Sequence, residues 1–438
     1  MQAHPSRAPA ANPEDAPMTT PTTQPGSNRL TTDPSILNSD SEPERPPLST
    51  RVLARRVDEV PRSGIRRFFD ILATMTDVIS LGVGEPDFDT PQQVIEAGRH
   101  SLASHRTHYA SNYGTLELRR ALAHHLERLY DVRYDPTEEI LITIGASEAL
   151  DVAVRATIDP GDEVVMHEPS YVSYRPAVIF AGGVPVGVPT TLDEDFALDP
   201  AKVEAAITPR TKAILINYPC NPTGAVLPTE VQDEIARIAV RHDLLVYSDE
   251  IYDRLVYGGY QMRTMSALPG MRRRTVLMGG FSKAYAMTGW RIGYICAPSE
   301  ILEGILKVHQ YVIMSAPTVA QDAALEALKT GEPDVARMVG QYDRRRRMLV
   351  DGFNAIGLRT FEPLGAFYAF PQISSTGLSS DAFAEELLRE ESVAVVPGTA
   401  FGEAGEGHVR CCYATSEAEL REALVRIERF VKRRKGEA

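Results

Sequence analysis

Four short apolar runs, each followed at once by small or polar residues, constrain the fold of this chain more than any other feature. They cover residues 140–144, 213–216, 244–247 and 275–278. Continuous apolar runs of this length, bounded by turn-forming residues, are typical of strands buried on both faces. Open parallel sheets bind their ligands outside the carboxyl ends of such strands. The residues that follow the four runs are therefore the first candidates for a functional site.

The run at 275–278 leads into residues 280–293, which read GFSKAYAMTGWRIG. This segment places Lys283 among small residues, with Arg291 eight positions later. A lysine in this setting can form an imine with a phosphorylated aldehyde, because its small neighbours leave room for a ring and the arginine supplies a cation for the phosphate. A lone lysine after a strand is more often a solvated surface residue, but such a residue needs no Gly, Ser and Ala around it.

At every position the segment 280–293 resembles the lysine-attachment signature of the class I and II aminotransferases, which use pyridoxal 5′-phosphate (PLP). The resemblance covers about residues 50–435 and is closest to the aromatic and aspartate aminotransferase branch. It implies an α/β protein of PLP-dependent transferase fold type I. A large domain would carry a mostly parallel seven-stranded sheet between helices, beside a small α/β domain.

The resemblance also implies a domain organisation. Residues 51–88 would form an N-terminal arm and part of the small domain, 89–320 the large PLP-binding domain, and 321–438 the small C-terminal domain. Residues 1–50 differ in kind, because they contain ten prolines and almost no apolar periodicity. Such a composition cannot bury enough surface to offset the entropy of ordering, so we expect a disordered tail. The tail lacks the charge and apolar pattern of a secretory signal.

Asp249 follows the run at 244–247, in the sequence Ser-Asp-Glu-Ile-Tyr. A carboxylate at this place can keep the pyridine nitrogen of PLP protonated, which makes the ring a sink for electrons. We expect Asp249 in this role, and we expect Tyr252 to donate a hydrogen bond to the phenolic oxygen of the ring. As an alternative, Asp249 and Glu250 are ordinary acidic residues at the start of a helix.

The run at 213–216 leads into Asn-Tyr-Pro-Cys-Asn-Pro-Thr-Gly at 217–224. Pro222 restricts the backbone of Asn221, and Gly224 permits a sharp turn, so the Asn221 amide is held in one direction. The element resembles the Asn-Pro-x-Gly motif of the family. This implies that Asn221 contacts the phenolic oxygen of PLP and lies beside the substrate carboxylate. The same string also occurs as a purely structural turn.

A phosphate site is expected where the run at 140–144 ends. Gly145, Ala146 and Ser147 form a turn that opens a helix, with apolar residues recurring at 150, 154 and 158. The first N–H groups of a helix are unpaired and its dipole is positive there, so the turn suits an anion. We expect Ser282 and Arg291 to complete the site. A capped helix without a ligand is the alternative.

The resemblance assigns the remaining roles. Tyr171 would stack on the face of the pyridine ring. Arg410 lies inside an apolar, strand-like run, where a charge is costly unless it is paired; it would bind the substrate α-carboxylate in the planar geometry that favours arginine. Gly84 would contact the substrate through its backbone, and Phe367 would line an apolar pocket. Tyr109 would reach the phosphate bound by a neighbouring subunit, which implies a homodimer with shared active sites.

Composition and charge exclude other classes. Of 438 residues, 43% are hydrophobic and 24% are charged, which is close to the globular average. The net charge of −13 argues against a nucleic-acid partner, and no apolar stretch is long enough to span a membrane. The four cysteines, at 220, 296, 411 and 412, lack metal or disulfide spacing and are expected to be buried thiols. We expect a cytoplasmic enzyme without a metal, and we expect the arginines at 344–347 on a solvated helix face.

The function implied is amino-group transfer in two half-reactions. An L-amino acid would react through a Lys283 aldimine, and a 2-oxo acid, 2-oxoglutarate, would then receive the amino group. Aspartate-preferring relatives carry a lysine at the position of Ser147, so the serine favours an aromatic or large apolar donor. An aspartate-preferring aminotransferase and a PLP-dependent β-lyase stay open. So does a regulatory protein with an aminotransferase-like sensor domain, although the tail offers it no DNA-binding segment.

Overall fold

The computed structural model describes residues 52–61 and 77–436, so the disorder predicted for residues 1–50 lies outside the described residues. The main sheet has seven strands in the order β2-β8-β7-β6-β5-β3-β4. Strand β8 is antiparallel to β2 and β7, and the other pairs are parallel. The strands are β2 (Ile140–Thr143), β3 (Glu163–Glu168), β4 (Val184–Pro189), β5 (Thr211–Ile216), β6 (Leu245–Asp249), β7 (Thr275–Gly280) and β8 (Gly293–Cys296). The predicted mostly parallel seven-stranded sheet is confirmed.

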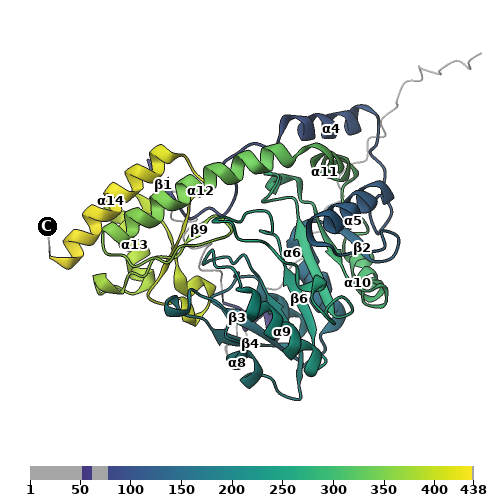
Figure 1. The fold of residues 1–438 in the computed structure, drawn as a ribbon, viewed down its shortest axis with the longest axis horizontal. Helices are drawn as coiled ribbons and strands as arrows, with labels where there is room; N and C mark the ends of the chain where they lie inside the picture. Colours follow the sequence, from purple (N-terminus) through teal and green to yellow (C-terminus); the bar gives the residue numbers. More distant parts are fainter. Residues whose placement is uncertain (1–51, 62–76, 437–438) are drawn as a thin grey trace, which may run out of the picture. The chain divides into compact units, whose positions relative to one another are not determined.

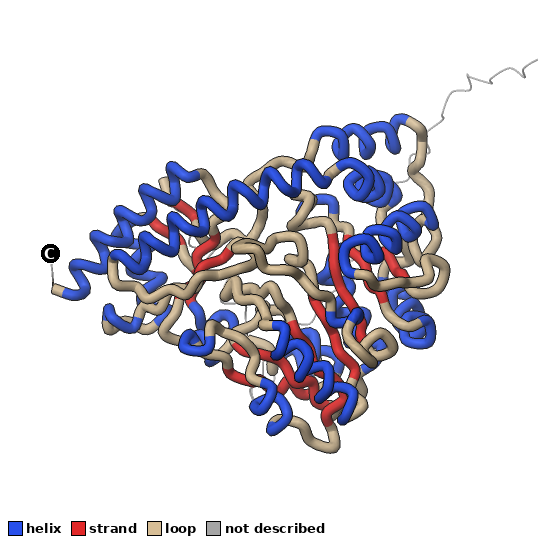
Figure 2. Tube along the Cα trace, viewed as in Figure 1, coloured by secondary structure: helices blue, strands red, loops and turns tan. Residues whose placement is uncertain are grey.

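Helices cover both faces of this sheet, as Figure 2 shows. Successive side chains of a strand point to opposite faces, and the apolar runs supply both sets. Leu141, Val276 and Met278 pack against the helices of one face, whereas Ile142 and Leu277 pack against those of the other. The first face is covered by α6 (Gly145–Thr157), α7 (Tyr174–Ala181) and α10 (Ser299–Val312). The second face is covered by α5 (Leu116–Tyr130), α8 (Pro200–Ala205), α9 (Thr229–Arg241) and α11 (Thr318–Thr330).

A second group of elements combines residues 79–80 with the C-terminal part of the chain. Strand β1 (Ile79–Ser80) pairs in parallel with β10 (Val393–Ala394), and Figure 1 shows β1 beside the yellow C-terminal elements. An antiparallel sheet has the order β11-β12-β9. Its strands are β9 (Tyr368–Ala369), β11 (Val396–Pro397) and β12 (Val409–Cys412). Helices α12 (Glu332–Ala355), α13 (Ser380–Glu391) and α14 (Glu417–Lys435) share one apolar core with β1, β9, β10 and β12. The domain boundaries at 88 and 320 stay a prediction.

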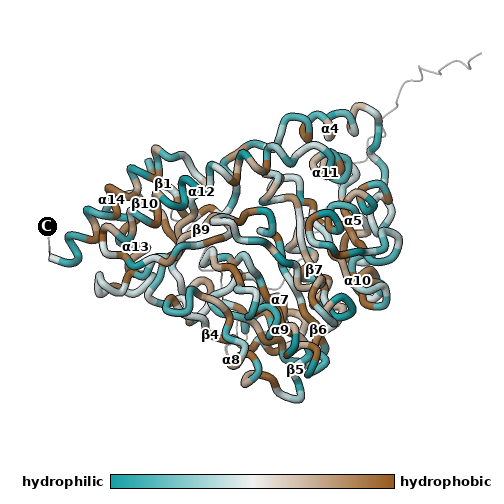
Figure 3. Tube along the Cα trace, in the orientation of Figure 1, coloured by the Kyte–Doolittle hydropathy of each residue, from teal (hydrophilic) through white to brown (hydrophobic). Residues whose placement is uncertain are grey.

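The remaining elements are short or peripheral. They are α2 (Arg55–Asp58), α4 (Gln92–Ala103) and the 3-10 helices η2 (Leu192–Glu194), η3 (Met265–Ala267), η4 (Thr288–Trp290), η5 (Ser374–Thr376), η6 (Gly398–Phe401) and η7 (Glu403–Gly405). Figure 3 shows hydrophobic residues gathered along β5, β6 and β7, and alternating with hydrophilic residues along α14. In the described part of the chain, no helix combines the length and the apolar character needed to cross a membrane. All four cysteines are buried free thiols, as predicted.

The prediction of a solvated face for the arginines at 344–347 is wrong for two of them. Arg345 and Arg346 are buried in α12, while Arg344 and Arg347 are exposed. Arg346 donates hydrogen bonds to Asp343 and Glu362, so its charge is paired. The physical reason is helical geometry: consecutive residues are about 100° apart around the axis, so four in a row cannot share one face.

Candidate active site

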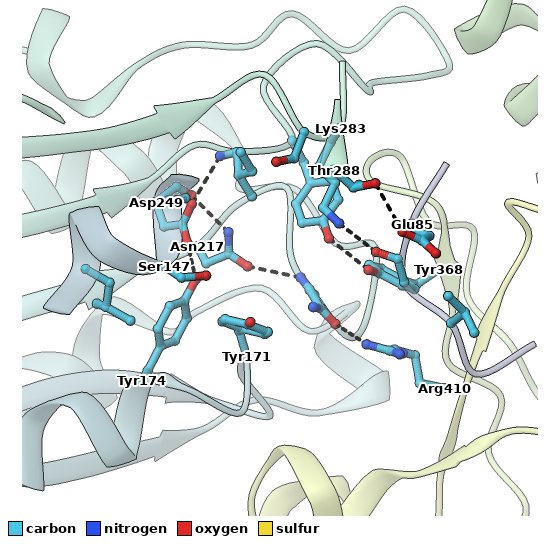
Figure 4. Close-up of a pocket in the computed structure, with 18 of the residues that line it drawn as sticks. Glu85, Ser147, Tyr171, Tyr174, Asn217, Asp249, Lys283, Thr288, Tyr368 and Arg410 are labelled. Carbon is cyan, nitrogen blue, oxygen red and sulfur yellow. Dashed lines mark hydrogen bonds between the residues drawn. The ribbon is translucent and has the colours of Figure 1, made fainter. Parts of the chain in front are cut away.

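A cavity of about 510 Å³ lies where the parallel strands end (Figure 4). Its walls come from the first turns of α6 and α7, from the end of β6, from the loops after β3, β5, β6 and β7, and from residues 82–85, β9 and β12. The predicted site residues that line it are Gly84, Ala146, Ser147, Tyr171, Asn221, Asp249, Tyr252, Ser282, Lys283, Arg291 and Arg410. Residues far apart in the sequence therefore meet in one cavity, because the carboxyl ends of parallel strands share one edge of a sheet.

Three other predicted residues do not line the cavity. Gly145 lies behind Arg291, and Tyr109 is 83% exposed on the surface. Phe367 is fully buried in the core, with its ring 5.5 Å from that of Tyr252. The expectation that Phe367 lines the pocket is not met. Its neighbour Tyr368 lines the cavity instead, because adjacent side chains of an extended chain point in opposite directions.

Lys283 follows the end of β7 and its amine reaches across the cavity. The Nζ atom donates a hydrogen bond to the carbonyl oxygen of Gly84 at 2.6 Å. Burial lowers the pKa of Lys283 to about 8, and the positive charges of Arg410 and Arg291 act in the same direction. At pH 7 about a tenth of this amine is neutral, against far less for a free lysine. Lys283 can therefore act as a nucleophile or a base near neutral pH.

This lowered pKa has a measurable consequence. In the cofactor-free protein, we expect acylation of Lys283 to become half-maximal near pH 8, whereas a lysine in a short unstructured peptide should follow the ordinary pKa of about 10.4. The neutral amine reacts and the ammonium does not, so reactivity rises with pH through the pKa of each lysine. Mass-spectrometric counting of acylated peptides between pH 6 and about 11 would measure both curves. Identical curves for the two lysines would show that the pKa of Lys283 is not lowered.

Asp249 is the last residue of β6 and its carboxylate is buried. One oxygen accepts from the Tyr174 hydroxyl at 2.7 Å, and the other from the Ile251 amide at 3.1 Å. Burial raises the pKa of Asp249 to about 6, although these two donors oppose the shift. The carboxylate is thus ionised at neutral pH in a place where its charge is poorly solvated, which suits it to pair with a cation. No helix begins at Asp249 or Glu250, so the alternative of a helix start is wrong.

A chain of hydrogen bonds connects Asp249 with Arg410 (Figure 4). The Asn217 amide donates to the Asp249 carbonyl oxygen at 2.9 Å, and the Asn217 side-chain oxygen accepts from the Asn221 backbone at 3.1 Å. Asn221 in turn accepts from Arg410 Nη1 at 2.9 Å. Arg410 Nη2 donates to the Gly82 carbonyl oxygen at 2.7 Å. The network fixes the directions of the Asn221 and Arg410 side chains, which contact each other in the wall of the cavity.

Arg410 keeps unused donors. Its Nε is buried and has no hydrogen-bond partner among the described residues. The guanidinium also lies over the rings of Tyr368 and Phe401, at 4.5 and 4.9 Å from their centroids. No carboxylate is paired with it among the described ion pairs, although Arg410 is buried on β12. A buried cation without an anion is suited to bind one from outside.

The start of α6 and Arg291 form a positive corner of the cavity. Gly145 has a φ of +73°, and a Cβ atom there would lie 2.8 Å from Nη2 of Arg291. Only glycine therefore allows this guanidinium to approach the start of the helix. Ser147 of the first turn and Ser282 line the same cavity. Helix N–H groups, two hydroxyls and a guanidinium are the donors that a phosphate requires.

Three polar residues that line the cavity, Asn217, Tyr174 and Tyr368, were not predicted from the sequence. Asn217 directly follows the run at 213–216, so the rule that selected Asp249 and Lys283 could have found it. Tyr174 and Tyr368 carried no signal of their own, because a tyrosine near a strand end is usually a core residue. In the structure Tyr174 donates to Asp249, and the Tyr368 hydroxyl lies 2.8 Å from that of Tyr252.

Comparison with known proteins agrees with this geometry. Residues 76–427 match the family model of the class I and II aminotransferases. The chain belongs to this family. The aminotransferase is 46% identical to an aspartate aminotransferase of Pyrococcus abyssi and 43% identical to aromatic-amino-acid aminotransferase 2 of Thermococcus litoralis; each alignment covers 87% of this chain and 99% of the relative. The solved aspartate aminotransferase of Thermus thermophilus with maleate has a TM-score of 0.82 and 44% identity, over 86% of this chain and 99% of that one.

These findings confirm the fold and the enzyme class predicted from the sequence. The aminotransferase has PLP-dependent transferase fold type I, and it is a transferase of nitrogenous groups. Members of this family use PLP. The relatives are named as aminotransferases, which counts against the lyase and the regulatory alternatives. Their names include both aspartate and aromatic amino acids, so the choice of donor has to be argued from the site itself.

Proposed function

We propose that this aminotransferase uses PLP to move the amino group of an aromatic or large apolar L-amino acid to 2-oxoglutarate. The observation that carries the proposal is the set of charges around the cavity. Lys283, Arg291 and Arg410 are the cations among the described residues that line it. If Lys283 holds the cofactor, Arg291 its phosphate and Arg410 the α-carboxylate, none of these three cations is left for an acidic side chain of the donor. The second carboxylate of 2-oxoglutarate would then be bound by polar groups or by a cation outside this lining.

The residues present fit PLP. Gly145, Ala146, Ser147, Ser282 and Arg291 would hold the phosphate, since a Cβ on Gly145 would fill the space that the guanidinium needs. The buried Asp249 carboxylate would pair with the protonated ring nitrogen. The positive charge of that nitrogen would stabilise the carboxylate in place of the water that burial has removed. When bound, PLP supplies an electron sink for the breaking Cα–H bond.

Other cavity residues would position the ring. The Tyr171 ring would lie on one face, where its edge-to-face contact with Tyr174, at 5.5 Å between centroids, fixes its orientation. Asn221 and Tyr252 would donate to the phenolic oxygen. The Tyr252 hydroxyl lies 2.8 Å from that of Tyr368. When it accepts a hydrogen bond from Tyr368, its own O–H is free to donate to the phenolic oxygen.

The chain's own groups can then move the proton. The neutral amine of Lys283 would take the proton from Cα of the amino acid, and in the reverse direction the ammonium would return a proton to Cα. It can do both because its pKa lies close to neutral pH. Arg410 holds the α-carboxylate through the donors that Asn221 and Gly82 leave free. Gly84 borders the substrate space and accepts from Lys283, so it orients the amine.

Donor selection follows from the walls of the cavity. Tyr171, Tyr174, Tyr368, Leu150 and Ile251 line it, and they offer apolar and aromatic surface to a side chain. Position 147, where a lysine would meet an acidic side chain, is a serine. Glu85 also lines the cavity and adds a negative charge. The runner-up is an aspartate-preferring enzyme, which the name of the Pyrococcus abyssi relative favours.

Kinetics with two donors would decide between them. With 2-oxoglutarate as acceptor, we expect kcat/KM for phenylalanine to exceed that for aspartate by about ten to a few hundredfold, the range that apolar pockets reach. Ser147→Lys should raise kcat/KM for aspartate and leave that for phenylalanine less changed; Ser147→Ala is the control for loss of the hydroxyl. A clear preference of the unmodified enzyme for aspartate would contradict the proposed donor class.

A homodimer with shared active sites belongs to the same proposal. Tyr109 lies outside the cavity of its own chain and is exposed, as a residue that serves a neighbouring subunit would be. Tyr311, at the end of α10, is 87% exposed, and Val312 and Met314 beside it are also exposed. Exposed apolar groups of this kind are typical of an interface. The cytoplasmic location expected from the sequence stays a prediction.

A further inference from the structure

Residues 82–88, called here the Gly84 segment, contribute residues 82–85 to one wall of the cavity and are held from two sides. Gly82 accepts a hydrogen bond from Arg410 at 2.7 Å, and Gly84 accepts from Lys283 at 2.6 Å. Space between the segment and β9 is tight, because a Cβ on Gly84 would lie 2.6 Å from the Tyr368 hydroxyl. A small shift of this segment therefore changes both the acceptor of Lys283 and the shape of the cavity.

An ion pair from outside the cavity holds the far end of this segment. Arg345 of α12 donates from Nη1 to the Asp87 carboxylate at 2.8 Å, with the two side chains 7% and 24% exposed. Its guanidinium lies 5.2 Å from the centroid of the Phe88 ring and 5.7 Å from that of Tyr342. Arg345 Nε has no hydrogen-bond partner among the described residues. A buried cation with one carboxylate partner is strongly destabilised when that partner leaves, so the pair resists movement of Asp87.

We propose that Arg345 is a positioning residue for Lys283. By holding Asp87 it fixes the Gly84 segment, and thereby keeps the Gly84 carbonyl oxygen at the amine of Lys283. Pro86 stands between Gly84 and Asp87 and has a fixed φ, so a constraint on Asp87 passes along a stiff link. Arg345 does not line the cavity, and it acts through the segment alone. The inference rests on the role proposed for Lys283.

The test uses the PLP-loaded enzyme and two readouts. In Arg345→Met we expect KM for the amino donor to rise about tenfold while kcat falls less than about threefold, because a loosened segment must be ordered each time substrate binds. Hydrogen exchange of the backbone amides at 82–88 should become faster. Arg344→Met is the matched control: this neighbouring arginine is exposed and lies 3.8 Å from Glu417, so neither readout should change.

A double-mutant cycle separates positioning from general stability. Asp87→Asn should reproduce both effects, and Arg345→Met with Asp87→Asn should be no worse than the poorer single variant, since the two groups act as one pair. Arg345→Lys keeps the charge and should restore part of the KM. If Arg345→Met does not fold, Arg345→Lys takes its place in the cycle with Asp87→Asn.

Two outcomes would overturn the inference. One is a lower melting temperature with unchanged KM and unchanged exchange at 82–88, which would make the pair merely structural. The other is additive effects of the two single substitutions. Failure of the role proposed for Lys283 would be seen separately, as amino-group transfer that persists in Lys283→Ala. Hydrogen exchange at residues 82–88 is measured independently of that activity.

Discussion

Replacing Lys283 by alanine is expected to abolish amino-group transfer while the fold persists. The expected loss in kcat is at least about 10⁴-fold, because the variant loses both the covalent attachment point and the base. The structural cost should be small, since the described amine makes one hydrogen bond, to the Gly84 carbonyl oxygen. Oxo-acid formation from a panel of amino acids would measure the loss. The purified wild-type enzyme should also show the visible absorption of a lysine-bound cofactor, which the variant should lack.

Lys307→Ala provides the control for this experiment. Lys307 is an exposed residue of α10 whose described partner is Glu303, at 3.6 Å, and its removal should leave both activity and absorption unchanged. Melting temperatures of the two variants should lie close to that of the wild type. Detection of the same lysine-bound absorption in Lys283→Ala would show that another lysine holds the cofactor.

Asp249→Asn is expected to slow removal of the Cα proton by several powers of ten, at about 1.4 kcal/mol per tenfold. Asparagine keeps the shape of the side chain but has no charge to hold the ring nitrogen protonated. Cofactor binding should weaken less than the rate falls, because Arg291 and the start of α6 remain. Stopped-flow measurement with Cα-deuterated donor would show whether proton removal has become the slow step. PLP titration would give the binding constant.

The matched control is Asp253→Asn. Asp253 is also buried and accepts a hydrogen bond from a tyrosine, Tyr130, at 2.7 Å, and burial raises its pKa. It does not line the cavity, so its neutralisation should leave the rate of proton removal close to that of wild type. Wild-type kcat in Asp249→Asn would mean that some other group keeps the ring protonated.

Much of the fold and most of the candidate site could be predicted because each depends on local sequence. Residues 140–144, 213–216, 244–247 and 275–278 are too apolar to face water, so they become the buried strands β2, β5, β6 and β7. Parallel strands bring their carboxyl ends to one edge, and Asp249 and Lys283 meet there. Gly145 could be found for a related reason, since a tight turn into a helix needs a positive φ.

Other features depended on packing between segments far apart in the sequence, and only the tertiary structure decided them. Phe367 and Tyr368 are equally aromatic, and which of them faces the cavity depends on how β9 pairs with β12. The burial of Arg345 depends on Asp87, more than 250 residues earlier, whose carboxylate makes a buried cation tolerable. The sequence by itself determined the strands, the turns and the chemical groups, because those follow from the hydrophobicity and backbone preferences of neighbouring residues. The directions in which those groups point were decided by long-range contacts that local pattern does not encode.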